Sequence, residues 1–305
     1  MKYIVICGPT CSGKTTLGIK LAARFDGEII SADSRQIYRY INIGTAKPAP
    51  DEYRDIKYHL IDFLELNADF SAYRFADLAS DLINDIIEKG KVPIVVGGTG
   101  LYLKALTEGL FKSPEPSYRY RKELERICEK QGPVALHKKL AEVDPAAASK
   151  INPLDKVRLV RALEVYRLTG KPISELQQKG KYKKTGRPLW LGLAPPRKKL
   201  YENIDKRVDK MIVEGFEEEV LDLKPYIEVL RRKKVVGYTD MIEYLFDKEI
   251  TKQQAIEKVK QHQRNYAKRQ MTWFRNVPGV IWFDPLEEDF LDKVYQICDE
   301  YLKSA

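Results

Sequence analysis

The sequence predicts an α/β protein in which a doubly wound, mainly parallel sheet carries an inserted all-helical domain. Over the first 100 residues, apolar runs typical of buried strands alternate with helical patterns. A glycine-rich turn that contains a lysine follows the first apolar run, and strand patterns are absent between residues 113 and 187. We therefore expect an α/β core made of residues 1–112 and 188–305, interrupted by a helical domain of residues 113–187.

The glycine-rich turn follows an apolar run at residues 3–7 that is typical of a buried strand. It reads Gly8-Pro9-Thr10-Cys11-Ser12-Gly13-Lys14-Thr15 and fits the phosphate-binding pattern G-x-x-x-x-G-K-[ST] of nucleotide-binding and ATP-binding proteins. In this motif, backbone N–H groups and a helix dipole surround the phosphate, and the lysine adds a positive charge. The fold expected is thus P-loop NTPase-like, with residues 8–15 binding a diphosphate and Thr15 as a ligand of Mg²⁺.

A carboxylate of the kind that helps to hold Mg²⁺ in ATP-hydrolysing P-loop proteins is hard to find. The apolar run at residues 93–96 ends in Gly97-Gly98-Thr99-Gly100, where an acidic residue would be expected. The run near Leu60 ends in Asp62, whose surroundings are ordinary. This pattern favours a site in which diphosphate is a leaving group and no phosphoryl group is transferred.

The remaining elements follow in the order that this fold requires. We expect the strand at residues 28–31 to deliver Asp33, Ser34, Arg35 and Gln36 to the carboxyl edge of the sheet, where open α/β sheets bind ligands. Further strands are expected at 58–63, 92–96, 188–193 and 280–283. Helices are expected at 14–25, 71–90, 118–130, 134–143, 153–169, 197–214, 216–223 and 251–275, with a terminal helix after the last strand.

The positive charge of the chain is concentrated in the insertion. Residues 112–187 hold 19 Lys or Arg against 9 Asp or Glu, whereas the rest of the chain holds 34 against 35. Such a distribution indicates that the insertion binds a polyanion, and we favour a nucleic acid because the excess coincides with a separate structural segment. The alternative interpretation is a solvated helical surface.

The cysteines and the apolar segments bear on location. Four cysteines are scattered without C-x-x-C spacing, and the chain opens on a strand pattern and not on a signal-peptide run. No segment approaches the length needed to span a membrane. We expect a monomer in the reducing cytoplasm that makes no membrane contact.

Several blocks together resemble the tRNA dimethylallyltransferase family. Besides the P-loop they are DSRQIY at 33–38, IGTAKP at 43–48, GGTGLY at 97–102, NPLD at 152–155, RLVRALEV at 158–165, VGY at 236–238 and YAKRQMTWFR at 266–275. The match runs in order through nearly the whole chain. It departs at Cys11, where the family usually has alanine, and at Asp240, where a glutamate is usual.

The resemblance implies an activity. Members transfer a dimethylallyl group from dimethylallyl diphosphate to N6 of adenosine 37, next to the anticodon, in tRNAs that read codons beginning with U. The products are N6-(dimethylallyl)adenosine and diphosphate. A P-loop without an obvious second carboxylate suits a prenyl diphosphate, and a basic insertion suits the anticodon stem-loop.

The resemblance and the chemistry together give the candidate residues their roles. Asp33 is the expected general base, because the weakly nucleophilic exocyclic amine needs an acceptor for its proton. Thr99 is expected to donate to the bridging oxygen, and Arg207 to bind the diphosphate as a second cation. Each has a structural alternative: a turn-forming Asp, a helix N-cap and an exposed helix arginine.

The acceptor adenine is expected to leave the stacked loop and enter a channel that leads to the diphosphate. Contacts to that base or its neighbours are expected from Asp33, Ser34, Arg35, Gln36 and Thr99. In the insertion, the residues expected to position the tRNA are Arg119, Val157, Arg158, Leu159, Val160 and Arg161. The arginines among them could also be ordinary surface charge.

Three other functions are considered from the same residues. An adenylate isopentenyltransferase of the cytokinin type, acting on free AMP, ADP or ATP, would share the P-loop, Asp33 and Thr99 but would not need the basic insertion. An ATP-dependent small-molecule kinase would need a metal-holding carboxylate, for which Asp33 is the best candidate. An RNA-binding module with a relict nucleotide fold would tolerate the loss of Asp33.

Overall fold

The computed structural model describes residues 1–53, 55–112, 114–179 and 185–304. The chain forms two compact units, one of Met1–Thr107 with Thr185–Ala305 and one of Glu108–Lys184. Thr185 belongs to the first unit because its side chain hydrogen-bonds to Ser80 and its carbonyl accepts from the Tyr3 hydroxyl. Of the basic stretch at 180–187 and the Pro-rich break at 112–116, residues 113 and 180–184 lie outside the described residues.

The first unit is built on a six-stranded sheet in the order β3-β2-β4-β1-β5-β6, in which every strand pair is parallel. The strands are β1 (Lys2–Cys7), β2 (Gly27–Ser31), β3 (Tyr58–His59), β4 (Val92–Val96), β5 (Arg187–Leu193) and β6 (Val280–Phe283). From the central β1, the chain first forms β2, β3 and β4 on one side of the sheet and then β5 and β6 on the other. The predicted doubly wound α/β fold is confirmed, and the P-loop follows the strand at which the winding reverses.

The third strand is shorter than expected. We predicted it at residues 58–63, but only Tyr58 and His59 pair with β2. Leu60 and Asp62 have positive φ angles of 56° and 53°, which turn the backbone out of the extended conformation. The expected boundaries of β4 and β6 agree with the structure.

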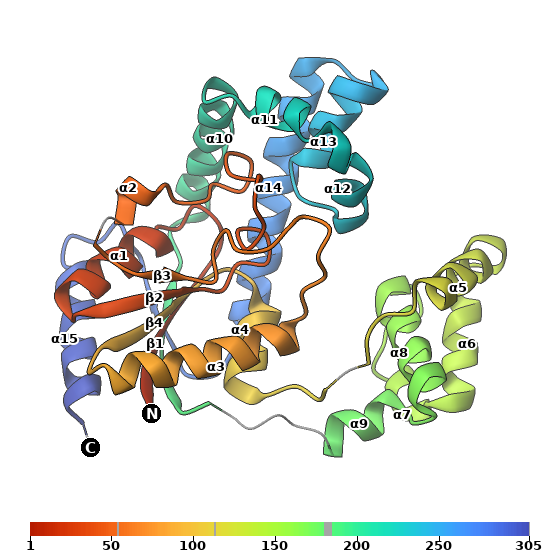
Figure 1. Ribbon diagram of the computed structural model, residues 1–305, viewed down its shortest axis with the longest axis horizontal. Coiled ribbons are helices and arrows are strands. Elements are labelled where there is room, and N and C mark those ends of the chain that lie inside the picture. The colour runs from red at the N-terminus through yellow and green to blue at the C-terminus, as the bar shows by residue number, and fades with distance from the viewer. Residues whose placement is uncertain (54, 113, 180–184, 305) are drawn as a thin grey trace. The chain divides into compact units, whose positions relative to one another are not determined.

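Helices cover the sheet of the first unit, with α3 (Ala72–Glu88) lying along it (Figure 1). The others near the sheet are α1 (Lys14–Arg24), α2 (Pro50–Tyr53), α4 (Gly100–Glu108) and α15 (Phe290–Lys303). The sequence pattern did not predict α4, because its start in Gly97-Gly98-Thr99-Gly100 is typical of a loop. Among the described residues, no helix combines the length and apolar character that crossing a membrane would require.

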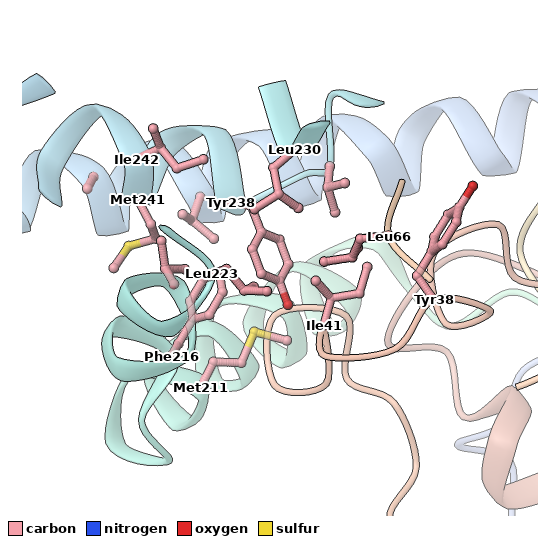
Figure 2. Close-up of a cluster of buried hydrophobic side chains, with 14 of the residues drawn as sticks. Tyr38, Ile41, Leu66, Met211, Phe216, Leu223, Leu230, Tyr238, Met241 and Ile242 are labelled. Atoms are coloured by element: carbon pink, nitrogen blue, oxygen red, sulfur yellow. The ribbon is translucent and has the colours of Figure 1, made fainter. Parts of the chain in front are cut away.

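The C-terminal helices enclose a second apolar core. They are α10 (Arg197–Val213), α11 (Phe216–Asp222), α12 (Ile227–Lys233), α13 (Tyr238–Ile242) and α14 (Lys252–Phe274), with a 3-10 turn at Lys224–Tyr226 and a π turn at Glu243–Asp247. Ile37, Tyr38 and Ile41 from the segment after β2, and Leu66 from the segment after β3, pack into this core. In Figure 2 the Tyr238 hydroxyl points toward the loop that carries Ile41. The loop beyond Asp33 is therefore held by helices from the far end of the chain.

The second unit is a small helical bundle around its own core. It contains α5 (Tyr118–Gln131), α6 (Pro133–Val143), α7 (Pro145–Ala148), α8 (Lys156–Thr169) and α9 (Ile173–Lys179). The helix expected at 153–169 begins at Lys156, because the Asp155 side chain caps it by accepting from the Arg158 N–H. This bundle corresponds to the helical insertion, although its limits differ by a few residues from those expected.

A buried carboxylate joins three segments of the bundle. Glu164 is fully buried on α8, and its oxygens accept from the Ser117 N–H at 2.7 Å and from Arg121 at 2.8 and 2.9 Å. Arg161 donates to the same carboxylate and to the Pro114 carbonyl. Burial opposes ionisation of Glu164, but the hydrogen bonds from Arg121 and Arg161 outweigh it and lower its pKa.

Glu164→Gln should destabilise the bundle at pH 7 by about 3 kcal/mol, because two arginines lose a buried counterion. The pKa of Glu164 is lower in the folded state, so its contribution is complete above the unfolded pKa of about 4.3 and is lost as pH falls through the folded pKa. Hydrogen–deuterium exchange of α5 and α8 in the full chain should be roughly a hundredfold faster at pH 7. The difference in exchange rate between Glu164→Gln and the native chain should shrink toward pH 3.

The control is Glu142→Gln on the exposed face of α6, which should leave the exchange of α5 and α8 unchanged. Equal protection in Glu164→Gln and the native chain at pH 7 would contradict a stabilising role for the buried carboxylate.

Candidate active site

The glycine-rich turn adopts a conformation that positions its amides. Gly8, Cys11 and Gly13 have φ angles of 144°, 60° and 90°, and Gly13 directly precedes α1. A Cβ at Gly8 would lie 2.6 Å from the Leu193 carbonyl, so only glycine fits between β1 and the end of β5. Residues 8–15 thus form a P-loop between strand and helix, the arrangement on which the sequence prediction of a phosphate site depended.

A glutamine from the far end of the chain connects this loop to the end of β4. Gln270 on α14 is buried, and its Oε1 accepts from the Thr10 N–H at 2.8 Å. Its Nε2 donates to the Gly98 carbonyl at 3.0 Å. A Cβ at Gly98 would lie 2.2 Å from Nε2, which explains why glycine occupies this position. One amide therefore fixes the relative position of two loops at the edge of the sheet.

Two cations lie at the P-loop. Arg207 on α10 donates from Nη2 to Thr10 Oγ1 at 2.6 Å and to Gln263 Oε1 at 3.3 Å. Lys14 Nζ donates to the Pro9 carbonyl at 2.5 Å. Burial lowers the pKa of Lys14 to about 8, and the nearby Asp33 carboxylate opposes that shift. The two cations repel each other, so an anion bound between them would be favourable.

Two buried polar atoms at this position have no hydrogen-bond partner among the described residues. They are Ser12 Oγ in the P-loop and Arg207 Nε on α10. A buried donor without a partner costs about 1–3 kcal/mol, which a ligand that accepts hydrogen bonds can recover. The P-loop amides, the two cations and these two groups together fit a diphosphate.

Asp33 lies at the neighbouring strand end, just beyond β2. Its Oδ1 accepts from the Arg35 N–H at 2.8 Å and from the Gln36 N–H at 3.2 Å. The turn-forming role given as the structural alternative is thus real. It involves one carboxylate oxygen, however, and Oδ2 has no partner among the described residues, so that the same turn orients Oδ2 for a second contact.

Thr99 connects this turn to the end of β4. Its Oγ1 accepts from the Ser34 N–H at 2.9 Å, and its hydroxyl also hydrogen-bonds to Tyr266 on α14. Burial raises the pKa of Tyr266 to about 12, so the phenol keeps its proton. Because Oγ1 accepts from the Ser34 N–H, the Thr99 hydroxyl proton is directed away from Ser34, toward Tyr266 or a ligand. Asp33 and Thr99 therefore lie on adjacent loops joined by a hydrogen bond.

The glycines around Thr99 permit this close approach. A Cβ at Gly97 would lie 2.2 Å from the Ala32 carbonyl, and one at Gly100 would lie 2.3 Å from the Trp273 ring. The GGTG sequence is therefore needed for packing of β4 against β2 and α14, in addition to presenting the hydroxyl.

A metal ion would obtain few ligands from the chain. No cluster of three His, Cys, Asp or Glu residues able to hold a metal is present in the described ranges. Thr15, in the first turn of α1, offers one hydroxyl. Mg²⁺ often binds through one or two protein ligands with phosphate oxygens and water supplying the others. The site therefore fits a metal that arrives with a diphosphate.

The predicted RNA-binding residues fall into two groups, one in each unit. Ser34, Arg35 and Gln36 follow Asp33 in the first unit, and the Gln36 amide donates to the carbonyls of Thr45 and Ala46. In the second unit, Arg119, Val157 and Arg158 are exposed, with Arg158 near Asp155 at 3.3 Å. Leu159 and Val160 are buried in the bundle core, and Arg161 binds Glu164. In this second group, the side chains that reach the surface are those of Val157 and the three arginines.

Sequence reasoning gave no role to two residues of the site, Gln263 and Gln270. Both are buried polar side chains on α14, and their separation of seven residues places them on one face. Glutamine at two core positions of an amphipathic helix is a signal that could have been noticed. Their partners, Arg207 and the P-loop, are visible only in the folded chain.

Comparison with known proteins identifies the family. A family model described as IPP transferase matches residues 36–277. The chain belongs to the IPP transferase family. The resemblance drawn from the sequence blocks is thereby confirmed, and with it the expected enzyme class.

Individual relatives of the IPP transferase family cover almost the whole chain. A tRNA dimethylallyltransferase of Geobacillus thermodenitrificans is 46% identical over 97% of this chain and 95% of its own length. A tRNA dimethylallyltransferase of Caldanaerobacter subterraneus is 43% identical over 99% of this chain and 98% of its own length.

Solved structures extend the likeness. The full-length tRNA isopentenylpyrophosphate transferase of Bacillus halodurans is 38% identical, with a TM-score of 0.70 over 99% of this chain and 97% of that one. A eukaryotic dimethylallyltransferase acting on tRNA is 30% identical, with a TM-score of 0.80 over 99% and 79%.

Gln270→Leu should weaken the binding of inorganic diphosphate about tenfold. The leucine keeps the volume but leaves the Thr10 N–H and the Gly98 carbonyl without partners, so the P-loop loses its fixed position. Isothermal titration calorimetry with Mg²⁺ and diphosphate measures the change. Gln261→Leu, on the exposed side of the same helix, should bind as the native chain does, and equal affinity of the two variants would contradict the role of Gln270.

Proposed function

We propose that this protein transfers a dimethylallyl group from dimethylallyl diphosphate to N6 of adenosine 37 in tRNAs that read codons beginning with U. Its family and the names of relatives that cover almost the whole chain support tRNA prenyl transfer. One structural observation carries the mechanism. Asp33, with one oxygen fixed by two backbone amides, lies beside Thr99 and near Lys14 of the P-loop.

The chemistry divides between the two ends of the allylic C–O bond. As the bond breaks, the bonding electrons pass to the diphosphate oxygen and positive charge develops on the allyl carbon. The P-loop amides, Lys14 and Arg207 bind the developing negative charge, and Thr99 donates to the bridging oxygen. Ser12 Oγ and Arg207 Nε gain the acceptors that they lack among the described residues.

Asp33 acts on the acceptor. The N6 lone pair is delocalised into the adenine ring, so attack on the allyl carbon requires loss of an N6 proton. Asp33 Oδ2 accepts that proton while Oδ1 remains bound to the amides of Arg35 and Gln36. A new C–N bond replaces the C–O bond, and diphosphate leaves. Thr15 would hold Mg²⁺, which would neutralise part of the diphosphate charge.

The tRNA contacts follow the two groups of residues. Ser34, Arg35 and Gln36 continue the Asp33 turn and contact the flipped adenosine or its neighbours. In the helical unit, Arg119, Val157, Arg158 and the backbone at the start of α8 contact the anticodon stem-loop. We propose that the protein acts as a monomer and, because its substrate is a tRNA, in the cytoplasm.

A kinase would have to hold its metal with Asp33, because the other carboxylates near the strand ends are already paired. Asp62, one candidate for a metal-holding carboxylate, binds Lys47 at 2.5 Å. Glu28, at the start of β2, binds His59 at 2.7 Å. The adenylate isopentenyltransferase remains the closest rival because it would use the same P-loop, Asp33 and Thr99, and only the acceptor separates the two.

The experiment that tests the proposal supplies acceptors in parallel. The protein, Mg²⁺ and radiolabelled dimethylallyl diphosphate are incubated with unmodified tRNA that has adenosine at position 37, with the same tRNA carrying guanosine there, and with AMP. Label should enter only the first tRNA. Label in AMP would favour the adenylate enzyme, and no label in any acceptor would overturn prenyl transfer.

Asp33→Asn should lower the single-turnover rate by roughly a hundredfold or more, with tRNA affinity nearly unchanged. The asparagine oxygen can still accept from the amides of Arg35 and Gln36, so the turn is preserved while the proton acceptor is lost. Rates at saturating substrates and filter binding of tRNA measure the two quantities. A rate within threefold of the native value would remove Asp33 as the base.

Arg158→Ala should weaken tRNA binding and make the slope of log K against log salt concentration less negative by about one. Arg158 is exposed, whereas Arg161 is tied to Glu164, so the single variant avoids damage to the bundle. Lys150→Ala, an exposed lysine of the same unit, is the control. An unchanged slope in Arg158→Ala would exclude a phosphate contact there.

A further inference from the structure

We propose that Glu219 on α11 is a positioning residue for the proton acceptor Asp33. The inference rests on the proposed function, because it concerns the rate of the same transfer. It is carried by a set of hydrogen bonds that converge on the Glu219 carboxylate and continue through one loop to Asp33.

The Glu219 carboxylate binds three successive backbone amides. Oε2 accepts from the N–H groups of Asn42 and Ile43, each at 2.8 Å, and Oε1 accepts from the Gly44 N–H at 3.1 Å. The Tyr238 hydroxyl donates to Oε1 at 2.5 Å. Four donors on one carboxylate make a charge-assisted anchor for this loop, stronger than bonds between neutral groups.

The loop is shaped to reach that anchor. A Cβ at Gly44 would lie 2.3 Å from the Phe216 ring and 2.6 Å from the Tyr238 ring, so glycine allows the backbone to lie against both aromatics. Thr45 Oγ1 donates to the Ile41 carbonyl at 2.7 Å, which closes the turn. The IGTAKP block therefore encodes a turn that fits onto α11 and α13.

The anchored 42–46 turn also holds Gln36 in place. The Gln36 Nε2 donates to the Thr45 carbonyl at 3.1 Å and to the Ala46 carbonyl at 3.0 Å. The Gln36 N–H donates to Asp33 Oδ1 at 3.2 Å. The path from Glu219 to Asp33 thus consists of the 42–46 turn and one glutamine, and it sets the direction of the carboxylate that receives the proton.

The role requires a carboxylate at position 219. Glutamine would present one oxygen to four donors and would place its own NH₂ against at least one backbone N–H, so part of the anchor would be lost. Misplacement of a reacting group by about 1 Å can slow a reaction by roughly a hundredfold. The P-loop is held separately by Gln270, so the diphosphate site should not depend on Glu219.

The experiment compares Glu219→Gln with Glu217→Gln, a matched change on the same helix. Glu217 binds Lys252 on α14 at 2.9 Å. Tyr238→Phe removes one of the four donors and keeps the backbone amides. For each variant we measure the single-turnover rate at saturating tRNA and dimethylallyl diphosphate, and the Kd of inorganic diphosphate with Mg²⁺.

Glu219→Gln should lower the single-turnover rate by about tenfold or more, with the Kd of diphosphate within threefold of the native value. Glu217→Gln should keep the rate within threefold of the native value, and Tyr238→Phe, which leaves three of the four donors, should lower the rate less than Glu219→Gln does. Combined with Asp33→Asn, Glu219→Gln should cause less than about twofold further loss, because a positioning residue has no effect once the group it positions is removed. A purely structural defect would multiply with the loss from Asp33→Asn.

Other outcomes would overturn the inference. If the native chain transfers label and Glu219→Gln does so equally fast, Glu219 is not a positioning residue and the proposed function stands. A native chain without transfer would overturn both. Glu219→Asp, which keeps the charge at a shorter reach, replaces Glu219→Gln if the latter does not fold. If neither variant binds diphosphate as the native chain does, Glu219 serves the whole unit and not Asp33.

Discussion

The buried amide of Gln270 is the contact on which the arrangement of the site depends. A parallel sheet brings the ends of β1, β2 and β4 to one edge, but it does not fix the loops that follow them. Gln270 binds the P-loop with its oxygen and the end of β4 with its nitrogen, and Thr99 joins the β4 end to the Asp33 turn. The phosphate site and the proton acceptor are therefore one hydrogen-bonded assembly.

The electrostatics of that assembly favour an occupied site. Lys14 and Arg207 lie close enough to repel each other, and burial lowers the pKa of Lys14. Ser12 Oγ and Arg207 Nε are buried without partners among the described residues. Two larger apolar clusters of the same unit, one around the sheet and one around the C-terminal helices, supply burial that offsets this local cost. Stability and ligand affinity are thus supplied by different parts of the same unit.

The sequence predicted most of the fold and the chemistry, and it missed what only tertiary contacts decide. The limits of β4 and β6 and the start of the helix expected at 251–275 were visible because they depend on local patterns. The strand at 58–63 was cut short by positive φ angles at non-glycine residues, which no period-two pattern reveals. The block at 158–165 was recognised from its resemblance, but the burial of Leu159 and Val160 depends on packing against other helices. Gln270 could not be given a role because its partner lies 260 residues away.

That separation has a consequence for how the protein is made. During synthesis the P-loop leaves the ribosome well before the helix that fixes it, because Thr10 and Gln270 are 260 residues apart. The N- and C-terminal elements also meet, since the Tyr301 hydroxyl accepts from the Tyr3 N–H, 298 residues apart. Contacts of such high sequence separation form late and slow the folding of a domain. A nascent chain released before α14 is complete would hold a phosphate loop without a fixed shape, so the ability to bind diphosphate should arise only after α14 has been made.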